Sequence, residues 1–284
     1  MHATTLVSTA ELAAHLDDPH WIIVDCRFSL ADTEHGRRAY VAGHIPGAHY
    51  LHLDEDLSSA ITPQTGRHPL PDPQVLTAKL QALGIGVNRQ VVVYDDSYGS
   101  MAVRLWWMLR WLGHPAVALL DGNFQTWVRE KRPLSQDIPS VLHQGACPCL
   151  PERSAWLSTT EMEQIVSDGS HLLIDARNEM RFTGAVDPID PVAGHIPGAI
   201  NWVFEENLDI DGTYLPPEAL RENYQALLGG RSPTEVIHVC GSGVTACHNL
   251  LAMEIAGLSG SRLYPGSWSE WIRDPKHPIA TGDS

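Results

Sequence analysis

Basic residues are scarce in this chain. Its 284 residues include 19 lysines and arginines against 34 aspartates and glutamates, which gives a net charge of −15 with histidine neutral. The lysines number three, and no run rich in lysine or arginine occurs: Lys79, Lys131 and Lys276. Surfaces that bind nucleic acids or anionic membranes need clustered positive charge. The sequence therefore predicts neither a nucleic-acid partner nor a membrane partner.

Long apolar runs and a regular cysteine framework are also missing. The most apolar stretch, Met101–Leu120, is interrupted by Arg104, Arg110 and a Gly-His-Pro break, so no transmembrane helix is expected. The first residues lack a basic region followed by an apolar core, so no signal peptide is expected. Five cysteines make a poor disulfide framework and favour a reducing, cytoplasmic location.

An internal repeat indicates the domain organisation. The segment Val41–Ala48 (VAGHIPGA) recurs letter for letter as Val192–Ala199, at an offset of 151 residues. The helix-start pattern Ser-x-x-Glu at Ser8 recurs at Ser158, at an offset of 150. Two copies of one domain follow from an offset this long and this constant. A proline-punctuated stretch over residues 131–155 separates the copies, and we predict domains at 1–145 and 146–284.

Each copy is predicted to be an α/β domain, with a parallel sheet flanked by helices on both faces. Short, β-branched-rich apolar runs without strict alternation are typical of strands buried on both faces. The predicted strands are Trp21–Val24, Val91–Tyr94, Val117–Leu120, Leu172–Ile174, Val236–Val239 and Arg262–Tyr264. Helices are predicted over Met101–Leu112 and Ala246–Ala256, each ending at a glycine. Ligands of such sheets bind beyond the carboxyl ends of the strands, which directs attention to the loops after Tyr94 and Val239.

These two loops differ at one position that matters chemically. Asp95 follows the strand in the first copy, and Cys240 holds the equivalent place in the second, where the loop reads CGSGVTA. We expect Gly241 and Gly243 to adopt positive φ angles, so that backbone N–H groups turn inward at the start of a helix. This setting lowers the pKa of a cysteine and makes its thiolate a nucleophile. We interpret Cys26 and Cys247 as packing residues, and Cys147 and Cys149 as packing or surface residues without a metal.

The duplicated domain, the repeated GHIPGA and the loop CGSGVTA together resemble the two-domain rhodanese family of sulfurtransferases. The loop is most similar to the 3-mercaptopyruvate sulfurtransferase branch. The resemblance implies that Cys240 attacks the sulfur of a small-molecule donor and becomes a persulfide, without a cofactor. A thiol, thioredoxin or cyanide then takes the outer sulfur. The loop amides would hold the anionic sulfur; they belong to Gly241, Ser242, Gly243, Val244 and Thr245.

Further roles are implied by the resemblance. Ser242 would polarise the donor or relay a proton, with assistance from Asp54 and His68 in the first copy. Arg181 would grip an anionic donor through its two-pronged guanidinium, with an ordinary surface ion pair as the alternative. For Thr245, capping of the following helix is the preferred interpretation. Arg177, close after the predicted strand and Asp175, is expected to pair within the domain.

The identity of the donor stays open at this stage. Members of the mercaptopyruvate type carry a second arginine downstream of the one that matches Arg181, and residues 182–194 contain none. Members of the thiosulfate type usually carry basic residues inside the loop, which here is neutral. We give the loop more weight, because it touches the sulfur, and predict 3-mercaptopyruvate as donor with thiosulfate as the alternative.

Other functions fit the sequence less well. The phosphatase branch of the same fold needs a longer loop that is closed by an arginine, which this loop lacks. A cysteine hydrolase needs a base near Cys240, and the loop contains no histidine. A non-catalytic rhodanese-like module that carries sulfur or binds a partner remains the alternative from another class.

Overall fold

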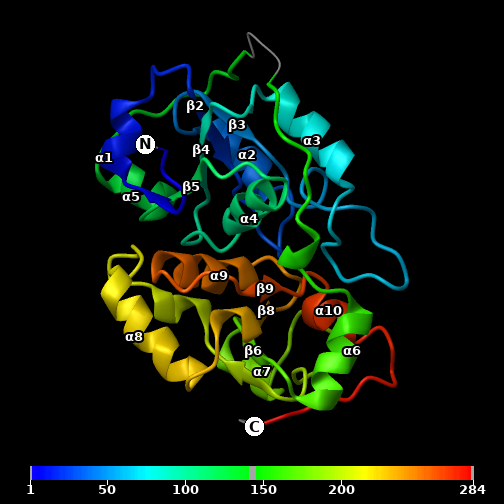
Figure 1. The fold of residues 1–284 in the computed structure, drawn as a ribbon. Coiled ribbons are helices and arrows are strands. Elements are labelled where there is room, and N and C mark those ends of the chain that lie inside the picture. The colour runs from blue at the N-terminus through cyan, green and yellow to red at the C-terminus, as the bar shows by residue number, and fades with distance from the viewer. Residues whose placement is uncertain (1, 141–144, 283–284) are drawn as a thin grey trace. The chain divides into compact units, whose positions relative to one another are not determined.

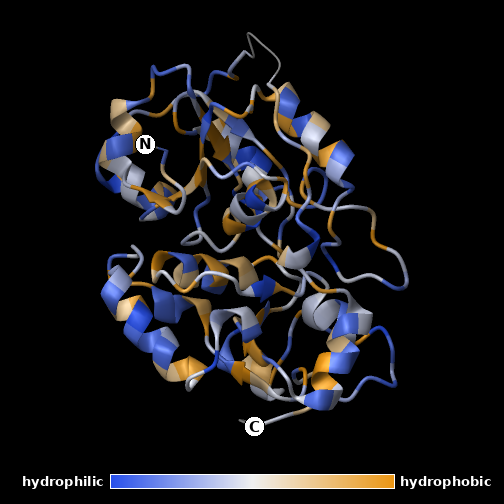
Figure 2. Ribbon diagram, in the orientation of Figure 1, coloured by the Kyte–Doolittle hydropathy of each residue, from blue (hydrophilic) through white to orange (hydrophobic). Residues whose placement is uncertain are grey.

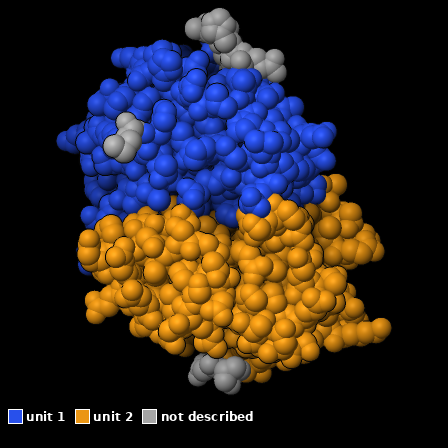
Figure 3. All heavy atoms as spheres, in the orientation of Figure 1, with its two compact units in different colours: residues 1–59, 70–152, 209–214 blue, residues 60–69, 153–208, 215–284 orange. Residues whose placement is uncertain are grey.

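A computed structural model describes residues 2–140 and 145–282, and the chain divides into two compact units. Unit 1 consists of residues 1–59, 70–152 and 209–214; unit 2 consists of residues 60–69, 153–208 and 215–284 (Figure 3). Residues 60–69, from the first half of the chain, thus belong to unit 2, and residues 209–214, from the second half, belong to unit 1. Residues 141–144 of the predicted linker lie outside the described part, and the boundary after residue 145 remains a prediction.

Unit 1 is built on a five-stranded parallel sheet in its described part, with the order β1-β5-β4-β2-β3 (Figure 1). The strands are β1 (Leu6–Val7), β2 (Trp21–Asp25), β3 (Ala48–Tyr50), β4 (Gln90–Tyr94) and β5 (Val117–Leu120). The helices are α1 (Thr9–Ala14), α2 (His35–Ala42), α3 (Pro73–Ala82), α4 (Val103–Trp111) and α5 (Asn123–Arg129). The predicted α/β class of the first copy is confirmed.

Unit 2 repeats this plan with a four-stranded parallel sheet in its described part, with the order β7-β6-β8-β9. Its strands are β6 (Leu172–Asp175), β7 (Ala199–Asn201), β8 (Val236–Val239) and β9 (Arg262–Leu263). Its α-helices are α6 (Thr159–Asp168), α7 (Glu179–Thr183), α8 (Pro217–Leu228), α9 (Ala246–Ile255) and α10 (Ser267–Trp271). Three short 3₁₀ helices are η1 (Arg153–Ala155), η2 (Phe204–Asn207) and η3 (Pro233–Glu235).

The two faces of the unit 2 sheet are covered by different helices. Ile237 and Val239 of β8 pack in one apolar cluster with residues of α6, α7 and α10. The other face is covered by α9, against which α8 packs. In Figure 2, α8 carries both hydrophilic and hydrophobic residues, as expected for a helix with one face in solvent. Alternate side chains of a strand point to opposite faces, so β8 is buried on both sides.

Local signals read from the sequence account for the start of α6 and for the ends of α4 and α9. Ser158 and Glu161 form the complete capping box expected at the start of α6. Gly113 follows α4 with φ +87°, and Gly257 follows α9 with φ +71°; this left-handed conformation is the one that glycine adopts at helix ends. The helices therefore stop where the strands of the sheet must resume.

His238 brings an ionisable group into the core of unit 2. Its side chain is fully buried in β8, with Nε2 3.1 Å from Ser261 Oγ and Nδ1 without a hydrogen-bond partner in the described structure. Burial lowers the pKa of His238 to about 3. The imidazole is therefore neutral in the folded protein at neutral and mildly acidic pH.

We predict that acid destabilises unit 2 through this histidine. Between its ordinary pKa of about 6.5 and about 3, the unfolded chain binds a proton that the folded chain does not, so stability falls as pH falls. From about pH 6 to about pH 4 this amounts to roughly 2–3 kcal/mol in the free energy of unfolding. Denaturant titrations at several pH values should show that His238→Gln lacks this slope of the free energy of unfolding against pH. The exposed His20→Gln should keep it; equal slopes for wild type and His238→Gln would contradict the prediction.

Candidate active site

Cys240 directly follows β8, at the carboxyl edge of the unit 2 sheet, and is 3% exposed. Its backbone N–H donates to Ser267 Oγ at 3.1 Å, and its carbonyl accepts from the N–H of Trp268 at 3.0 Å. The carbonyl of Gly241 accepts from the N–H of Ser269 at 2.9 Å. Three hydrogen bonds thus tie the start of the loop to the first turn of α10, and this fixes the position of the cysteine.

The two glycines of the loop serve different purposes. Gly243 has φ +72°, as expected, and a Cβ there would lie 2.2 Å from the carbonyl oxygen of Pro265. The expectation of a positive φ at Gly241 is wrong. A Cβ at Gly241 would instead lie 2.8 Å from Arg67 Nη2 and 3.1 Å from Arg181 Nη2. Gly241 thus leaves room for two guanidinium groups, which approach the backbone beside the cysteine.

The end of the loop forms the start of α9. Val244 is buried and Thr245 is half-buried. The predicted capping role of Thr245 is wrong: the residue holds the N-cap position, but its side chain makes no capping hydrogen bond and its backbone is already helical, with φ −63° and ψ −23°. A capping side chain usually needs an extended backbone at this position. Thr245 stays a candidate for substrate binding by prediction alone.

Ser242 and His68 meet inside unit 2. His68 Nδ1 lies 2.7 Å from Ser242 Oγ, and both side chains are buried. The segment that carries His68 is held on α10, where the N–H of Arg67 donates to Ser269 Oγ at 3.1 Å. The structure thus brings together two of the residues singled out from the sequence. Asp54 belongs to unit 1, in an exposed turn after β3, and its placement beside Ser242 remains a prediction.

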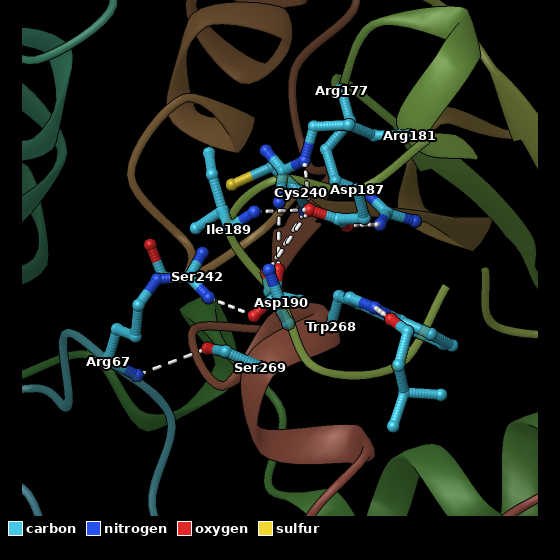
Figure 4. A network of polar contacts seen from close by, with 12 residues as sticks. Arg67, Arg177, Arg181, Asp187, Ile189, Asp190, Cys240, Ser242, Trp268 and Ser269 are labelled. Atoms are coloured by element: carbon cyan, nitrogen blue, oxygen red, sulfur yellow. Dashed lines mark hydrogen bonds and ion pairs between the residues drawn. The ribbon is translucent and has the colours of Figure 1, made fainter. Parts of the chain in front are cut away.

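Arg181 is engaged by two aspartates (Figure 4). Its Nε donates to Asp187 Oδ1 at 3.1 Å, and its Nη2 donates to Asp190 Oδ2 at 2.8 Å. The second oxygen of Asp190 accepts from Arg67 Nη1. The sequence analysis assigned no role to Arg67, because this residue lies far from the loop along the chain. The structure supplies a second guanidinium beside the loop from this distant segment.

The buried charged residues next to Arg181 also form ion pairs. Arg177 pairs with Asp175 at 2.7 Å, as predicted, and donates to the carbonyl of Gly194. Burial favours the neutral acid at Asp187, but N–H groups of Asp190 and Ile189 and the guanidinium of Arg181 outweigh it and lower the pKa of Asp187. Asp187 is therefore an anion at neutral pH, and it cancels part of the arginine charge.

The equivalent loop of unit 1 holds a buried carboxyl group, whose pKa is raised by burial although backbone N–H groups oppose the shift. Asp95 is fully buried, and its carboxylate accepts four backbone N–H groups, each at 2.8 Å, from Ser97, Gly99, Met101 and Ala102. The α-helix starts two positions later after Asp95 than after Cys240, so the two loops are not superimposable residue by residue. Even so, the loop between strand and helix in this fold can present several amides to one anionic group.

The remaining cysteines differ from Cys240 in their surroundings. All five are free. Burial, reinforced by Asp25, raises the pKa of Cys26 well above its usual range, and burial raises the pKa of Cys147 to about 12. Cys247 is buried in α9 and contacts the carbonyl of Gly243 through its Sγ, at 3.6 Å. The expectation that Cys26 and Cys247 are packing residues agrees with this burial.

One cluster of metal-ligating residue types occurs in the described part of the chain, formed by Glu34, His52 and Glu55 of unit 1. His52 already uses both ring nitrogens: Nε2 lies 3.0 Å from the carbonyl of Thr33, and Nδ1 accepts from backbone N–H groups of Asp54 and Glu55. The cluster thus lacks a free imidazole nitrogen for an ion. Among the described helices, none has the length and apolar character needed to cross a membrane.

Comparisons with known proteins agree with this architecture. A family profile described as "Rhodanese-like domain" matches residues 8–130 and 158–274. A protein of Pseudomonas aeruginosa named "Probable 3-mercaptopyruvate sulfurtransferase" is 47% identical and covers 100% of both chains. The thiosulfate sulfurtransferase of Rattus norvegicus is 32% identical over 98% of this chain and 96% of its own.

A solved structure gives the same result for the fold. The 3-mercaptopyruvate sulfurtransferase from Leishmania major matches with a TM-score of 0.83 and 32% identity, over 96% of this chain and 76% of that chain. The profile finds the domain twice, in the two segments where the sequence repeats itself and where the two parallel sheets form. The chain therefore belongs to the rhodanese family and carries two copies of its domain.

Proposed function

We propose that this protein is a sulfurtransferase that moves a sulfur atom from 3-mercaptopyruvate to a thiol, thioredoxin or cyanide through a persulfide on Cys240. The name of the Pseudomonas relative and the neutral loop CGSGVTA support this donor. The single observation that carries the proposal is the contact of 2.7 Å between His68 and Ser242, two residues after the buried cysteine. This contact supports the proposal that the two side chains transfer a proton during the reaction at Cys240.

The proposed first step is attack of the Cys240 thiolate on the donor sulfur. An S–S bond forms, the C–S bond of mercaptopyruvate breaks, and its electron pair passes to the carbon as the enolate of pyruvate. The proton of the donor thiol ends on that carbon, and Ser242 with His68 can relay it. Pyruvate leaves, and Cys240 keeps the sulfur as a persulfide anion.

The proposed second step returns the enzyme to its starting state. An acceptor thiolate or cyanide attacks the outer sulfur, the bond between Sγ and that sulfur breaks, and its electron pair returns to Cys240. Between the steps the persulfide needs stabilisation. We assign this to the loop amides of residues 241–245 and to the start of α9. The buried carboxyl group of Asp95 in the equivalent loop supports this assignment, since four backbone N–H groups donate to its oxygens.

Donor binding is assigned to Arg181, with Arg67 as a second guanidinium beside Gly241. Asp54 is proposed to assist Ser242 from unit 1. We propose residues 1–145 as the non-catalytic copy and 146–284 as the catalytic copy. A cytoplasmic location is proposed as well, because all five cysteines are free.

Thiosulfate remains the second candidate donor, and one observation favours it. Two arginines lie within reach of the loop, and the leaving group of thiosulfate is the sulfite anion, which positive charge stabilises. The thiosulfate sulfurtransferase of the rat is also a relative over nearly the full length. A module that accepts sulfur without turning over a small donor is the alternative from another class.

Steady-state transfer of sulfur to cyanide, measured side by side with both donors, tests the proposal. We expect a higher kcat/KM with 3-mercaptopyruvate. Cys240→Ser should lower the rate by at least about 10³-fold while its circular dichroism stays that of wild type. The control Cys149→Ser, at a half-buried position in the linker, should stay active. Retained activity in Cys240→Ser would contradict the mechanism, and no turnover of either donor would favour the carrier module.

The pair Ser242 and His68 should behave as one unit. We expect Ser242→Ala and His68→Ala each to lower kcat with mercaptopyruvate by about 100-fold. Because each change removes the same relay, the double variant should lose at most about twofold more. The exposed Ser259→Ala serves as the matched control. Losses that multiply in the double variant would show that the two side chains act independently.

Gly241→Ala should weaken donor binding more than it slows the chemical step. The added methyl group would lie within 3.1 Å of both guanidinium groups and must displace them, whereas the φ of Gly241 suits an alanine. We expect KM for the donor to rise by about tenfold, the loss of roughly one hydrogen bond to a charged group. At Gly43 a Cβ would meet only Leu134 Cδ1, at 3.8 Å, so Gly43→Ala is the control. An unchanged KM in Gly241→Ala would exclude the arginines from donor binding.

A further inference from the structure

A carboxylate of the protein lies between the two arginines that approach the loop. Asp190 Oδ2 accepts from Arg181 Nη2 at 2.8 Å, and Oδ1 accepts from Arg67 Nη1. The side chain of Asp190 is 2% exposed, while those of Arg67 and Arg181 are 22% and 11% exposed. Figure 4 shows Asp190 between Arg67 and Arg181. The buried carboxylate thus takes up part of the positive charge that an anionic ligand would otherwise meet.

A tight turn holds this carboxylate in place. The N–H groups of Ile189 and Asp190 both donate to Asp187 Oδ1 at 3.0 Å, and the same oxygen accepts from Arg181 Nε at 3.1 Å. Asp187 therefore organises the turn and binds one edge of Arg181, while Asp190 binds another. These hydrogen bonds hold Asp190 against the two guanidinium groups.

The charges around the loop cancel. Three arginines are matched by three aspartates, all joined by the ion pairs described above: Arg67, Arg177 and Arg181 with Asp175, Asp187 and Asp190. A ligand with one carboxylate can still receive hydrogen bonds from the guanidinium groups. The Coulomb attraction of a net positive charge for a dianion is twice its attraction for a monoanion. When that charge is cancelled, a dianion therefore loses twice as much binding free energy as a monoanion does.

We propose that Asp190 is the residue that sets donor choice, by neutralising the arginine pair so that the site accepts a monoanionic carboxylate donor and discriminates against a dianionic sulfur oxyanion. The inference rests on the proposed sulfur transfer. It also explains how an aspartate can stand in the stretch where the resemblance led us to look for a second arginine. Selectivity then arises from the loss of attraction for the wrong donor.

Asp190→Asn tests the proposal, since it removes the charge and keeps the shape. We expect the ratio of kcat/KM for thiosulfate to kcat/KM for 3-mercaptopyruvate to rise by about tenfold, mainly through a lower KM for thiosulfate. Asp190→Ser, a smaller uncharged replacement, should change the ratio in the same direction. Asp190→Glu keeps the charge and should keep the wild-type ratio.

Asp168→Asn is the matched control. Asp168 is exposed at the end of α6, before the amino end of β6, and therefore away from the carboxyl edge where the loop lies. The substitution Asp168→Asn removes the same charge from the protein. The ratio of kcat/KM for thiosulfate to kcat/KM for 3-mercaptopyruvate should stay within about twofold of wild type. An unchanged ratio in Asp190→Asn and Asp190→Ser, or an equal rise in Asp168→Asn, would overturn the proposal.

A binding measurement separates this proposal from the proposed function. Calorimetry on Cys240→Ser, with and without Asp190→Asn, would measure the affinities for inorganic sulfate, a dianion, and for pyruvate, a monoanion. We expect Asp190→Asn to raise the affinity for sulfate by about 100-fold and that for pyruvate by about tenfold, which gives the same tenfold change in ratio. This result would stand even if the wild-type protein turned over neither donor. Equal gains for both anions would overturn the proposal whatever the turnover.

Discussion

The hydrogen bonds between the start of the loop and the first turn of α10 are the contacts on which the candidate site depends. They join Cys240 and Gly241 to Ser267, Trp268 and Ser269, immediately after β8 has paired with β6 and β9. Unit 1 repeats this arrangement, where the carbonyl of Asp95 accepts from the N–H of Phe124. The parallel pairing of β8 with β6 and β9 determines where β8 ends. The hydrogen bonds to α10 then fix the position of the loop that begins at Cys240. The reactive position is thus determined by backbone contacts, and its chemistry can change from aspartate to cysteine without a change of fold.

Charge matching is the second constraint on the site. Each arginine near the loop is paired with an aspartate that is itself buried, because an unpaired charge would be costly there. The site therefore offers directed hydrogen bonds with little net field. We propose that such a site suits a small donor with one carboxylate and that Ser242 and His68 relay a proton to the carbon leaving group. The proposed function and the proposed role of Asp190 both follow from this balance.

Much of the fold was predictable because its signals are local. The strands that pair in the middle of each sheet are short β-branched runs, and the repeat of VAGHIPGA showed the duplication directly. The edge strands β3 and β7 were not predicted, because three residues are too few to show a period. They begin at the last alanine of each VAGHIPGA copy, so the repeat marked their place without revealing their structure.

The candidate site was predictable only in part. Cys240 stands out through its neighbours in sequence, whereas Arg67 and the ion pairs of Asp190 depend on contacts that only the folded chain creates. Gly241 shows the limit most clearly, since its lack of a side chain serves two distant arginines and not a positive φ. The helix at Thr245 likewise begins without a side-chain cap, because its backbone is already helical at that residue.

The most direct test of the account is mass spectrometry of peptides from the protein after incubation with 3-mercaptopyruvate and no acceptor. The account predicts that the peptide with Cys240 gains the mass of one sulfur atom and loses it when cyanide is added. The peptides with Cys26, Cys147, Cys149 and Cys247 should stay unmodified apart from any that share the Cys240 peptide. A sulfur atom carried elsewhere, or turnover without any modified Cys240, would contradict the account.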